Sequence, residues 1–313
     1  MKIVIAGGSG YLGKIIARYY NASTNEIIIL SRKPNPSVGN TKTVCWDGKT
    51  LGAWVPELEN ADVLINLAGK NVNCRYTAKN KKEILSSRVN ATKVLGEAVR
   101  LVKHPPALWI QGSSATIYRE SRDLMMNENG QRGIGFSEMV CRHWEKAFEQ
   151  VALPHTRKIT LRIGIVLGAS DSALPRLINL VKIGFGGRQG DGQQFMSWVH
   201  ENDVANVIEW LRTHPLQNGI YNCTSPRLVK NATFMSTLQH VLAMPFGIPI
   251  PRWLLAIGAF VIGTETELVL KSRKVYPQRL LDNGFVFEFP DLKSALVDLC
   301  QRETTDPNNI LLR

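Results

Sequence analysis

Residues 7–13 read Gly-Gly-Ser-Gly-Tyr-Leu-Gly, and this stretch decides the fold. It follows the short apolar run Lys2–Gly7, which is typical of a buried strand, and precedes Tyr11–Tyr20, whose apolar residues have helical spacing. The heptapeptide satisfies both Gly-x-Gly-x-x-Gly and Gly-x-x-Gly-x-x-Gly. We therefore predict a strand, a tight glycine turn and a helix in that order.

The key positions of this turn require glycine for physical reasons. The chain must adopt conformations that side chains forbid, and the last glycine lets the helix pack tightly on the strand. The backbone can then approach a pyrophosphate, which the free N–H groups and the dipole of the helix N-terminus stabilise. The pattern predicts a dinucleotide site at Gly7, Gly10, Tyr11, Leu12 and Gly13. A turn of the same shape without a ligand is the alternative.

The second predicted strand ends in Leu30-Ser31-Arg32-Lys33. Sites for NAD usually carry an acidic residue here, which binds the ribose 2′-hydroxyl. Arg32 can instead form paired hydrogen bonds with a 2′-phosphate, which a carboxylate would repel. The pattern favours NADP(H) as the cofactor, and a solvated basic strand end is the alternative.

Strand and helix patterns alternate over the first two-thirds of the chain. Near-continuous apolar strands separated by helices indicate a parallel sheet that is covered on both faces. Right-handed crossovers then give an α/β fold with a Rossmann-type, doubly wound parallel sheet. The predicted strands are Lys2–Gly7, Glu26–Leu30, Thr43–Trp46, Ala61–Ala68, Ala107–Gln111 and Lys158–Leu167, and the predicted helices are Tyr11–Tyr20, Thr77–Lys103 and Ser137–Val151.

The pattern changes after Gly168. Glycines crowd Gly184–Gly192, which suggests a mobile loop, and Trp198–Trp210 indicates a strand end that runs into a helix. We expect an NADP-binding domain over residues 1–168. Residues 169–313 are expected to form the substrate lobe and a small, mainly helical C-terminal lobe, with some elements returning to the first domain. The predicted helices lie near Trp253–Ile262, Glu265–Leu281 and Leu292–Leu299, before a polar, frayed tail at Arg302–Arg313.

Composition limits the class of protein and of partner. Of the 313 residues, 44% are hydrophobic and 20% are charged, which excludes disorder as the main state. The net charge of +12 favours anionic partners such as nucleotides. Because this charge is dispersed and no aromatic residues interleave it, we expect no nucleic-acid partner. The sequence allows a homo-oligomer.

Cysteine usage and hydropathy point to a cytoplasmic protein. The five cysteines are scattered, which predicts reduced thiols and no metal site. The longest apolar run, Trp253–Gly263, is too short to span a membrane. No signal peptide is expected, because the strand pattern already begins at Lys2.

These residues, together with later motifs, resemble the extended short-chain dehydrogenase/reductase superfamily. They are most similar to its atypical branch, the epimerase family proteins, and the resemblance covers nearly the whole chain. It implies an N-terminal dinucleotide domain and a small C-terminal helical substrate lobe. The motifs that carry it are Gly7–Gly13, Ser31–Pro34, Asn66–Gly69, Glu83–Arg88, Cys141–Glu145, Arg162–Gly168, Trp198–Asp203 and Gln278–Gly284.

The resemblance also implies roles for particular residues. Ser31 and Arg32 would hold the adenosine 2′-phosphate, and Val166 would lie near the nicotinamide. The end of the fourth strand would lie against the ribose and phosphates, and the next helix would face the cofactor. At the end of the fourth strand these residues are Leu67 and Ala68. On the next helix they are Glu83 and Arg88. A solvated helix face is the alternative for the helical pair.

The superfamily's usual proton-transfer pair, Tyr-x-x-x-Lys, is absent. Its Lys cation favours the tyrosinate, so that the Tyr can act as acid or base near neutral pH. None of the seven tyrosines has a lysine four residues later, and the expected places fall near Phe136 and Val140. The catalytic serine of the family corresponds to Ser114, for which a hydrogen-bonded turn is the alternative. The candidate replacement acids are Glu138, Cys141, His143 and Tyr118.

We therefore expect an NADP(H)-binding protein similar to atypical short-chain dehydrogenases/reductases. It would be an oxidoreductase or epimerase-type enzyme, and its small-molecule substrate is not identified by the sequence. The alternative is a non-catalytic NADP(H)-binding sensor or regulatory protein, which the missing Tyr and Lys favour. His200 and Asp203 are expected to order a loop at the substrate lobe more than to perform chemistry.

Overall fold

A computed structural model describes residues 1–21, 25–33, 39–255 and 270–305, and its centre is a seven-stranded sheet. All seven strands are parallel, in the order β10-β6-β5-β4-β1-β2-β3. The order reverses beside β1, which confirms the predicted doubly wound α/β fold. The strands are β1 (Lys2–Ala6), β2 (Glu26–Ser31), β3 (Thr41–Cys45), β4 (Val63–Asn66), β5 (Leu108–Ser114), β6 (Arg157–Ile163) and β10 (Gly219–Cys223).

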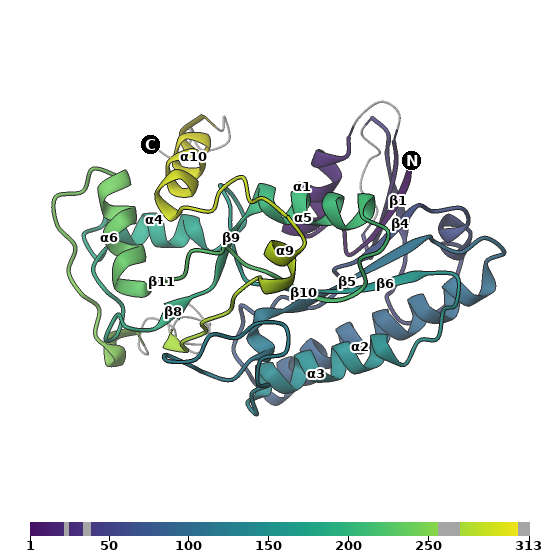
Figure 1. The fold of residues 1–313 in the computed structure, drawn as a ribbon, viewed down its shortest axis with the longest axis horizontal. Coiled ribbons are helices and arrows are strands. Elements are labelled where there is room, and N and C mark those ends of the chain that lie inside the picture. The colour runs from purple at the N-terminus through teal and green to yellow at the C-terminus, as the bar shows by residue number, and fades with distance from the viewer. Residues whose placement is uncertain (22–24, 34–38, 256–269, 306–313) are drawn as a thin grey trace.

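Helices cover both faces of this sheet (Figure 1). The helices α1 (Tyr11–Tyr19) and α5 (Glu201–Thr213) lie on one face, and α2 (Ala78–Leu101) and α3 (Phe136–Glu149) lie on the other. Successive side chains of a strand point to opposite faces, so β1 serves both cores. The side chains of Ile3 and Ile5 are buried under α1 and α5, whereas those of Val4 and Ala6 are buried under α2 and α3.

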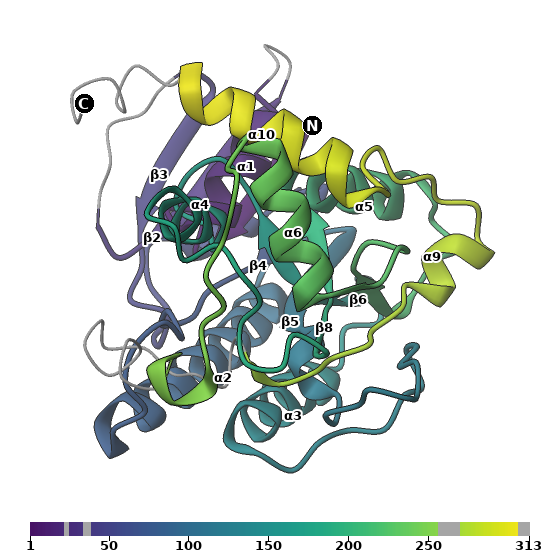
Figure 2. The ribbon, with the colours of Figure 1, turned by 90° about the vertical axis from the view of Figure 1, so that its left-hand side faces the viewer.

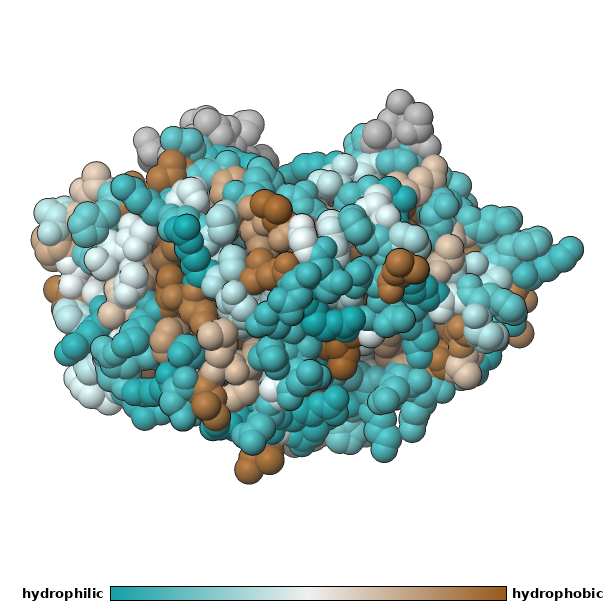
Figure 3. All heavy atoms as spheres, viewed as in Figure 1, coloured by the Kyte–Doolittle hydropathy of each residue, from teal (hydrophilic) through white to brown (hydrophobic). Residues whose placement is uncertain are grey.

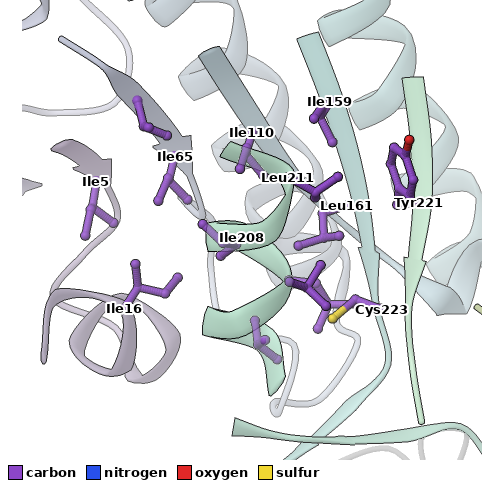
Figure 4. Packing of buried hydrophobic residues seen from close by; sticks show 14 of the residues in the cluster. Ile5, Ile16, Ile65, Ile110, Ile159, Leu161, Ile208, Leu211, Tyr221 and Cys223 are labelled. Carbon is purple, nitrogen blue, oxygen red and sulfur yellow. The ribbon is translucent and has the colours of Figure 1, made fainter. Parts of the chain in front are cut away.

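Large aliphatic side chains fill the core beneath α1 and α5. Ile16 of α1 and the residues Ile208 and Leu211 of α5 project toward a row of strand residues (Figure 4). Fully burying a side chain of this size stabilises the fold by about 1.5–3 kcal/mol relative to leaving it exposed. The strand residues labelled in this row are Ile5, Ile65, Ile110, Ile159, Leu161, Tyr221 and Cys223.

A second, smaller lobe is mainly helical and has its own apolar core (Figure 2). Side chains of α10 pack on α6 there, including Leu296 against the cluster that contains Phe234. The lobe comprises α4 (Leu174–Lys182), α6 (Asn231–Val241), α10 (Leu292–Thr305), the strand pair β7 (Ile165–Leu167) and β9 (Trp198–His200), and the pair β8 (Phe195–Met196) and β11 (Val229–Lys230). Because α5 and β10 belong with the large sheet, the chain crosses between the lobes more than once. The boundary at residue 168 stays a prediction.

The structure corrects three predicted segments near the C-terminus. The helix expected over Glu265–Leu281 is wrong in its described part, because residues 271–277 interrupt it between Leu270 and α9 (Gln278–Asp282). Residues 271–277 form neither a helix nor a strand apart from an isolated bridge at Val275, and their backbone is hydrogen-bonded to distant partners such as Ser121 and Phe195. α10 continues to Thr305, past the predicted start of the frayed tail. The helix expected over Trp253–Ile262 lies mostly outside the described residues.

Strand β10 is an element that the sequence pattern did not reveal. It is short and contains the polar residue Asn222, which is fully buried. The Asn222 side chain accepts a hydrogen bond from the Tyr118 hydroxyl at 2.7 Å, and its backbone N–H donates to Glu128 at 3.0 Å. Two of the polar groups of Asn222 are therefore satisfied by partners about 100 residues earlier in the chain.

The face of the molecule seen in Figure 3 is largely hydrophilic, and hydrophobic residues occur on it in small groups. Over the part of the chain that the structure describes, no helix combines the length and the apolar character that crossing a bilayer requires.

Candidate functional site

The glycine turn lies at the carboxyl end of β1, where each glycine has a different environment. Gly7 has φ +77°, and a Cβ there would lie 2.8 Å from the Ala68 Cα. A side chain at Gly13 would collide with the backbone of Gly8. At Gly10 a Cβ would meet only the Gly7 carbonyl oxygen, at 3.4 Å. Gly7 and Gly13 are thus required by the packing of the chain itself, and Gly10 leaves an open approach.

The N-terminus of α1 faces this approach without a side-chain cap. Gly10 is its N-cap residue, and the first turn contains no acidic residue. The first N–H groups of a helix have no partner within the helix, and the helix dipole favours an anion beside them. The turn and the first residues of α1, including Leu12, therefore leave N–H groups open to an anion, and their contact with a pyrophosphate stays a prediction.

The end of β2 places Ser31 and Arg32 differently. Ser31 is buried, and its hydroxyl donates to the Ser9 hydroxyl at 3.1 Å. Arg32 is exposed and lines an open hollow of about 540 Å³, together with residues of the 45–54 segment. The carboxylate in this hollow, Asp47, accepts the backbone N–H groups of Lys49 and Thr50, which hold its pKa below the usual range. Arg32 therefore places an exposed cation beside this hollow, and its contact with a 2′-phosphate stays a prediction.

The residues that follow β4 are held close to the glycine turn. The Leu67 N–H donates to the Ala6 carbonyl at 2.9 Å, and the Ala68 N–H donates to the Asn66 side chain at 3.0 Å. The Asn66 amide in turn donates to Gln111 of β5 at 2.9 Å, in the buried interior. A buried, hydrogen-bonded side chain thus fixes the segment that is predicted to touch the cofactor.

Glu83 and Arg88 both contact the loop after β4 from α2. Glu83 forms an ion pair with Lys70. Arg88 donates to the Lys70 carbonyl at 2.9 Å, and its guanidinium lies 5.1 Å from the centre of the Trp144 ring. Burial lowers the pKa of Arg88. The solvated-face alternative therefore does not describe Arg88, and the described contacts of both residues are with the loop that follows Ala68.

The places expected for the proton-transfer pair hold no ionisable group. Phe136 begins α3 and packs edge-on against Tyr76, with ring centres 5.0 Å apart, and Val140 is buried. Ser114 ends β5, where its hydroxyl accepts the Thr116 N–H at 3.2 Å and donates to the Thr116 hydroxyl. Ser114 therefore caps a short turn, which is the alternative that the sequence left open, and its catalytic role stays a prediction.

Two of the candidate replacement acids are unsuited to proton transfer near neutral pH. Burial raises the pKa of the Cys141 thiol to about 12. Burial also raises the pKa of Tyr118, whose hydroxyl accepts from Arg162 and donates to Asn222, at 2.7 Å each. These contacts give Tyr118 a structural role.

The other two candidates are placed differently. Glu138 is buried, and its carboxylate lies 3.1 Å from the Lys271 ammonium and 3.3 Å from the Arg273 guanidinium. His143 is exposed on α3, where its ring Nδ1 lies 2.9 Å from the Met139 carbonyl.

Val166, His200 and Asp203 lie where the two lobes meet. Val166 pairs with Val199 between β7 and β9 and packs against the core under α1 and α5. The His200 ring accepts the Asn202 N–H at 3.1 Å and stacks on Phe289. Asp203 accepts the N–H groups of Phe289 and its preceding residue at 3.0 and 2.8 Å. The last two residues thus order the 288–289 segment, in agreement with the loop-ordering role expected for them.

His200 predicts an acid-sensitive contribution to stability. Burial lowers the pKa of its ring to about 4, against about 6.5 for an ordinary histidine. The unfolded chain therefore binds a proton more readily than the folded protein. The contribution is fully present above about pH 6.5 and is lost as the pH falls toward 4, by about 3 kcal/mol in all.

The measurement compares urea unfolding of the unchanged protein and His200→Asn at pH 7, 5.5 and 4.5. Asn retains an acceptor for the Asn202 N–H but does not titrate. Burial raises the pKa of Asp203 to about 6, which gives the opposite trend. The stability difference between the two proteins is therefore the quantity to follow. It should shrink as the pH falls, and a constant difference would contradict the prediction.

Comparison with known proteins agrees with this geometry. The NAD dependent epimerase/dehydratase family matches residues 3–224, and a domain of unknown function (DUF1731) matches residues 250–299. The chain is 30% identical over 310 residues to the human epimerase family protein SDR39U1, covering 96% of this chain and 99% of that protein. It is 32% identical over 300 residues to YfhF of Bacillus subtilis, covering 96% and 98%.

A solved structure shows the same fold. The crystal structure of human SDR39U1 (isoform 2) with NADPH matches at a TM-score of 0.86 and 28% identity, over 96% of this chain and 99% of that chain. The chain therefore belongs to the NAD dependent epimerase/dehydratase family, in the group of epimerase family proteins that includes SDR39U1 and YfhF.

Proposed function

We propose that this protein binds NADP(H) and is an oxidoreductase or epimerase-type enzyme acting on a small molecule. The observation that carries the proposal is the exposed Arg32 at the end of β2, which lines the open hollow and follows Ser31, whose hydroxyl binds Ser9 of the glycine turn. An arginine there complements a 2′-phosphate by charge and by hydrogen-bond geometry. The NADPH described for human SDR39U1 supports the same cofactor.

Each part of the site would hold one part of the cofactor. The N-terminus of α1 would bind the pyrophosphate through its N–H groups, with Gly10 leaving room for it. Ser31 and Arg32 would bind the 2′-phosphate, Leu67 and Ala68 would contact the ribose and phosphates, and the nicotinamide would lie toward Val166.

The side chains present limit the reactions that the protein could catalyse with NADP(H) bound. A bound NADP(H) supplies hydride transfer, and the protein positions the reacting groups. The Ser114 hydroxyl would orient a substrate oxygen. Phe136 and Val140 neither donate nor accept protons, so the proton would come from Ser114 with water or from another group.

A non-catalytic NADP(H) sensor is the second candidate function. Its specific support is the apolar pair at the expected proton-transfer places, together with the structural bonds of Tyr118. Such a protein would bind the cofactor tightly and turn over no substrate.

Cofactor choice is tested by Arg32→Ala. The unchanged protein should bind NADPH more tightly than NADH, because a charge-assisted hydrogen bond contributes about 1.5–3 kcal/mol, or roughly 10- to 150-fold. Arg32→Ala should lose most of this preference without weakening NADH binding. Fluorescence titration at moderate salt measures both affinities. Lys93→Ala, which removes an exposed cation from α2, is the control. Equal affinities of the unchanged protein for the two cofactors would refute the proposal.

The place of the pyrophosphate is tested by Gly10→Val. Gly10 has φ −76° and ψ 169°, which any residue adopts, and a Cβ there meets only one backbone oxygen. The variant should keep its melting temperature and lose NADPH binding, because the new side chain fills the approach to α1. Gly13→Ala should instead lower the melting temperature through its backbone collision. A folded Gly10→Val that binds normally would place the cofactor elsewhere.

Catalysis is tested with NADPH and a panel of sugar nucleotides, aldehydes, ketones and quinones, followed by absorbance. General acid–base assistance contributes about 10²–10⁴-fold, so turnover of sugar nucleotides should be very slow or absent. Ser114→Ala should abolish any activity that remains. Rapid turnover of a sugar nucleotide would show that an effective proton donor is present. Tight NADPH binding without turnover of any compound in the panel would favour the sensor function.

A further inference from the structure

Tyr11 is the first residue of α1, directly after Gly10 of the glycine turn, and its side chain reaches the start of α5. Its hydroxyl donates to the carboxylate of Glu201, the first residue of α5. Any side chain at Gly168 would overlap this hydroxyl and the Glu201 carboxylate. Gly168, which follows β7, thus leaves the space that the contact between Tyr11 of α1 and Glu201 of α5 occupies.

Glu201 is itself tied to the C-terminal helix. Its side chain is only 6% exposed, and its second oxygen lies 3.6 Å from the Arg302 guanidinium of α10. Arg302 also makes a two-point contact with Asp298, at 3.0 and 3.1 Å, and Asp298 lies 3.2 Å from the His200 ring. A buried carboxylate costs free energy unless charges and hydrogen bonds compensate it. Arg302 supplies part of that compensation from α10.

The opposite ends of the same two helices show a similar contact that stays local. The Tyr20 hydroxyl, beside the C-terminal end of α1, donates to Glu209 of α5 at 2.9 Å. Glu209 is neutralised by Arg212 within α5, at 2.6 and 2.7 Å. Both ends therefore carry a Tyr–Glu–Arg chain, but only the chain at the glycine turn recruits its arginine from α10.

We propose that Glu201 and Arg302 are positioning residues of the dinucleotide site, through which α10 holds Tyr11 and the first turn of α1 in their binding conformation. The inference rests on the proposed binding of NADP(H) at that turn. Asp298, which binds Arg302, lies within the region matched by the domain of unknown function, and Arg302 lies just beyond that region. Because linkage is reciprocal, a bound dinucleotide should also stabilise the docking of α10.

The first measurement is NADPH affinity. Tyr11→Phe removes the hydroxyl and keeps the ring, and Arg302→Gln removes the cation, so each should weaken binding by about 5-fold or more. Their combination should be no weaker than the weaker single variant, because both act through Glu201. Arg302→Lys should restore part of the affinity. The matched controls Tyr20→Phe and Arg212→Gln should bind like the unchanged protein.

The second measurement is hydrogen exchange of residues 292–302, which a merely local defect at Tyr11 would not alter. NADPH should slow this exchange in the unchanged protein and in Tyr20→Phe, and it should have little effect on it in Tyr11→Phe. Equal affinities of the two tyrosine variants, additive losses in the double variant, or NADPH-independent exchange would each overturn the inference while leaving the proposed function intact. Absence of NADPH binding to the unchanged protein would overturn both.

Discussion

The close approach of β1 and β4 at their carboxyl ends is the constraint on which the rest of the structure depends. Gly7 has a positive φ, and a Cβ there would lie 2.8 Å from the Ala68 Cα, so the two loops fit only without a side chain. The strand order reverses here, and connections that leave on opposite faces open a crevice in which α/β proteins bind ligands. The hydrogen bond from Ala68 to Asn66 fixes the loop that forms one wall.

Strands β5 and β6 and helix α3 are joined by a buried ion pair. Arg162 of β6 is 1% exposed and forms two hydrogen bonds with Glu145 of α3, at 2.8 and 2.7 Å. The Ser113 hydroxyl donates to the same carboxylate at 2.7 Å. Breaking a buried pair of this kind typically costs about 3–5 kcal/mol. The helix that carries the proton-transfer pair in related enzymes is thus engaged here in holding β5 and β6 together, and these polar groups serve the fold.

Most of the large sheet and the core of the candidate site were predictable from sequence, because their signals are local. The glycine turn, the strand before it and the helix after it occupy one continuous stretch, and Arg32 follows the next strand directly. Strand β10 was missed because it contains a buried polar residue, Asn222. The groups that bind this residue are a hydroxyl and a carboxylate about 100 residues earlier in the chain. Ser114 was found from its place after β5, but its bonds to Thr116 were not visible in the sequence.

The sequence by itself determined the parallel sheet, the glycine turn and the basic residue after the second strand, because periodicity and glycine geometry act over a few residues. Only the tertiary structure decided that residues 271–277 are not helical, since their hydrogen-bond partners lie about 75 to 150 residues away. It also decided that Tyr11 meets Glu201 and that Arg302 faces the same carboxylate. Those contacts join three helices that no local pattern relates, and they exist because burying one carboxylate requires partners from wherever the folded chain can bring them.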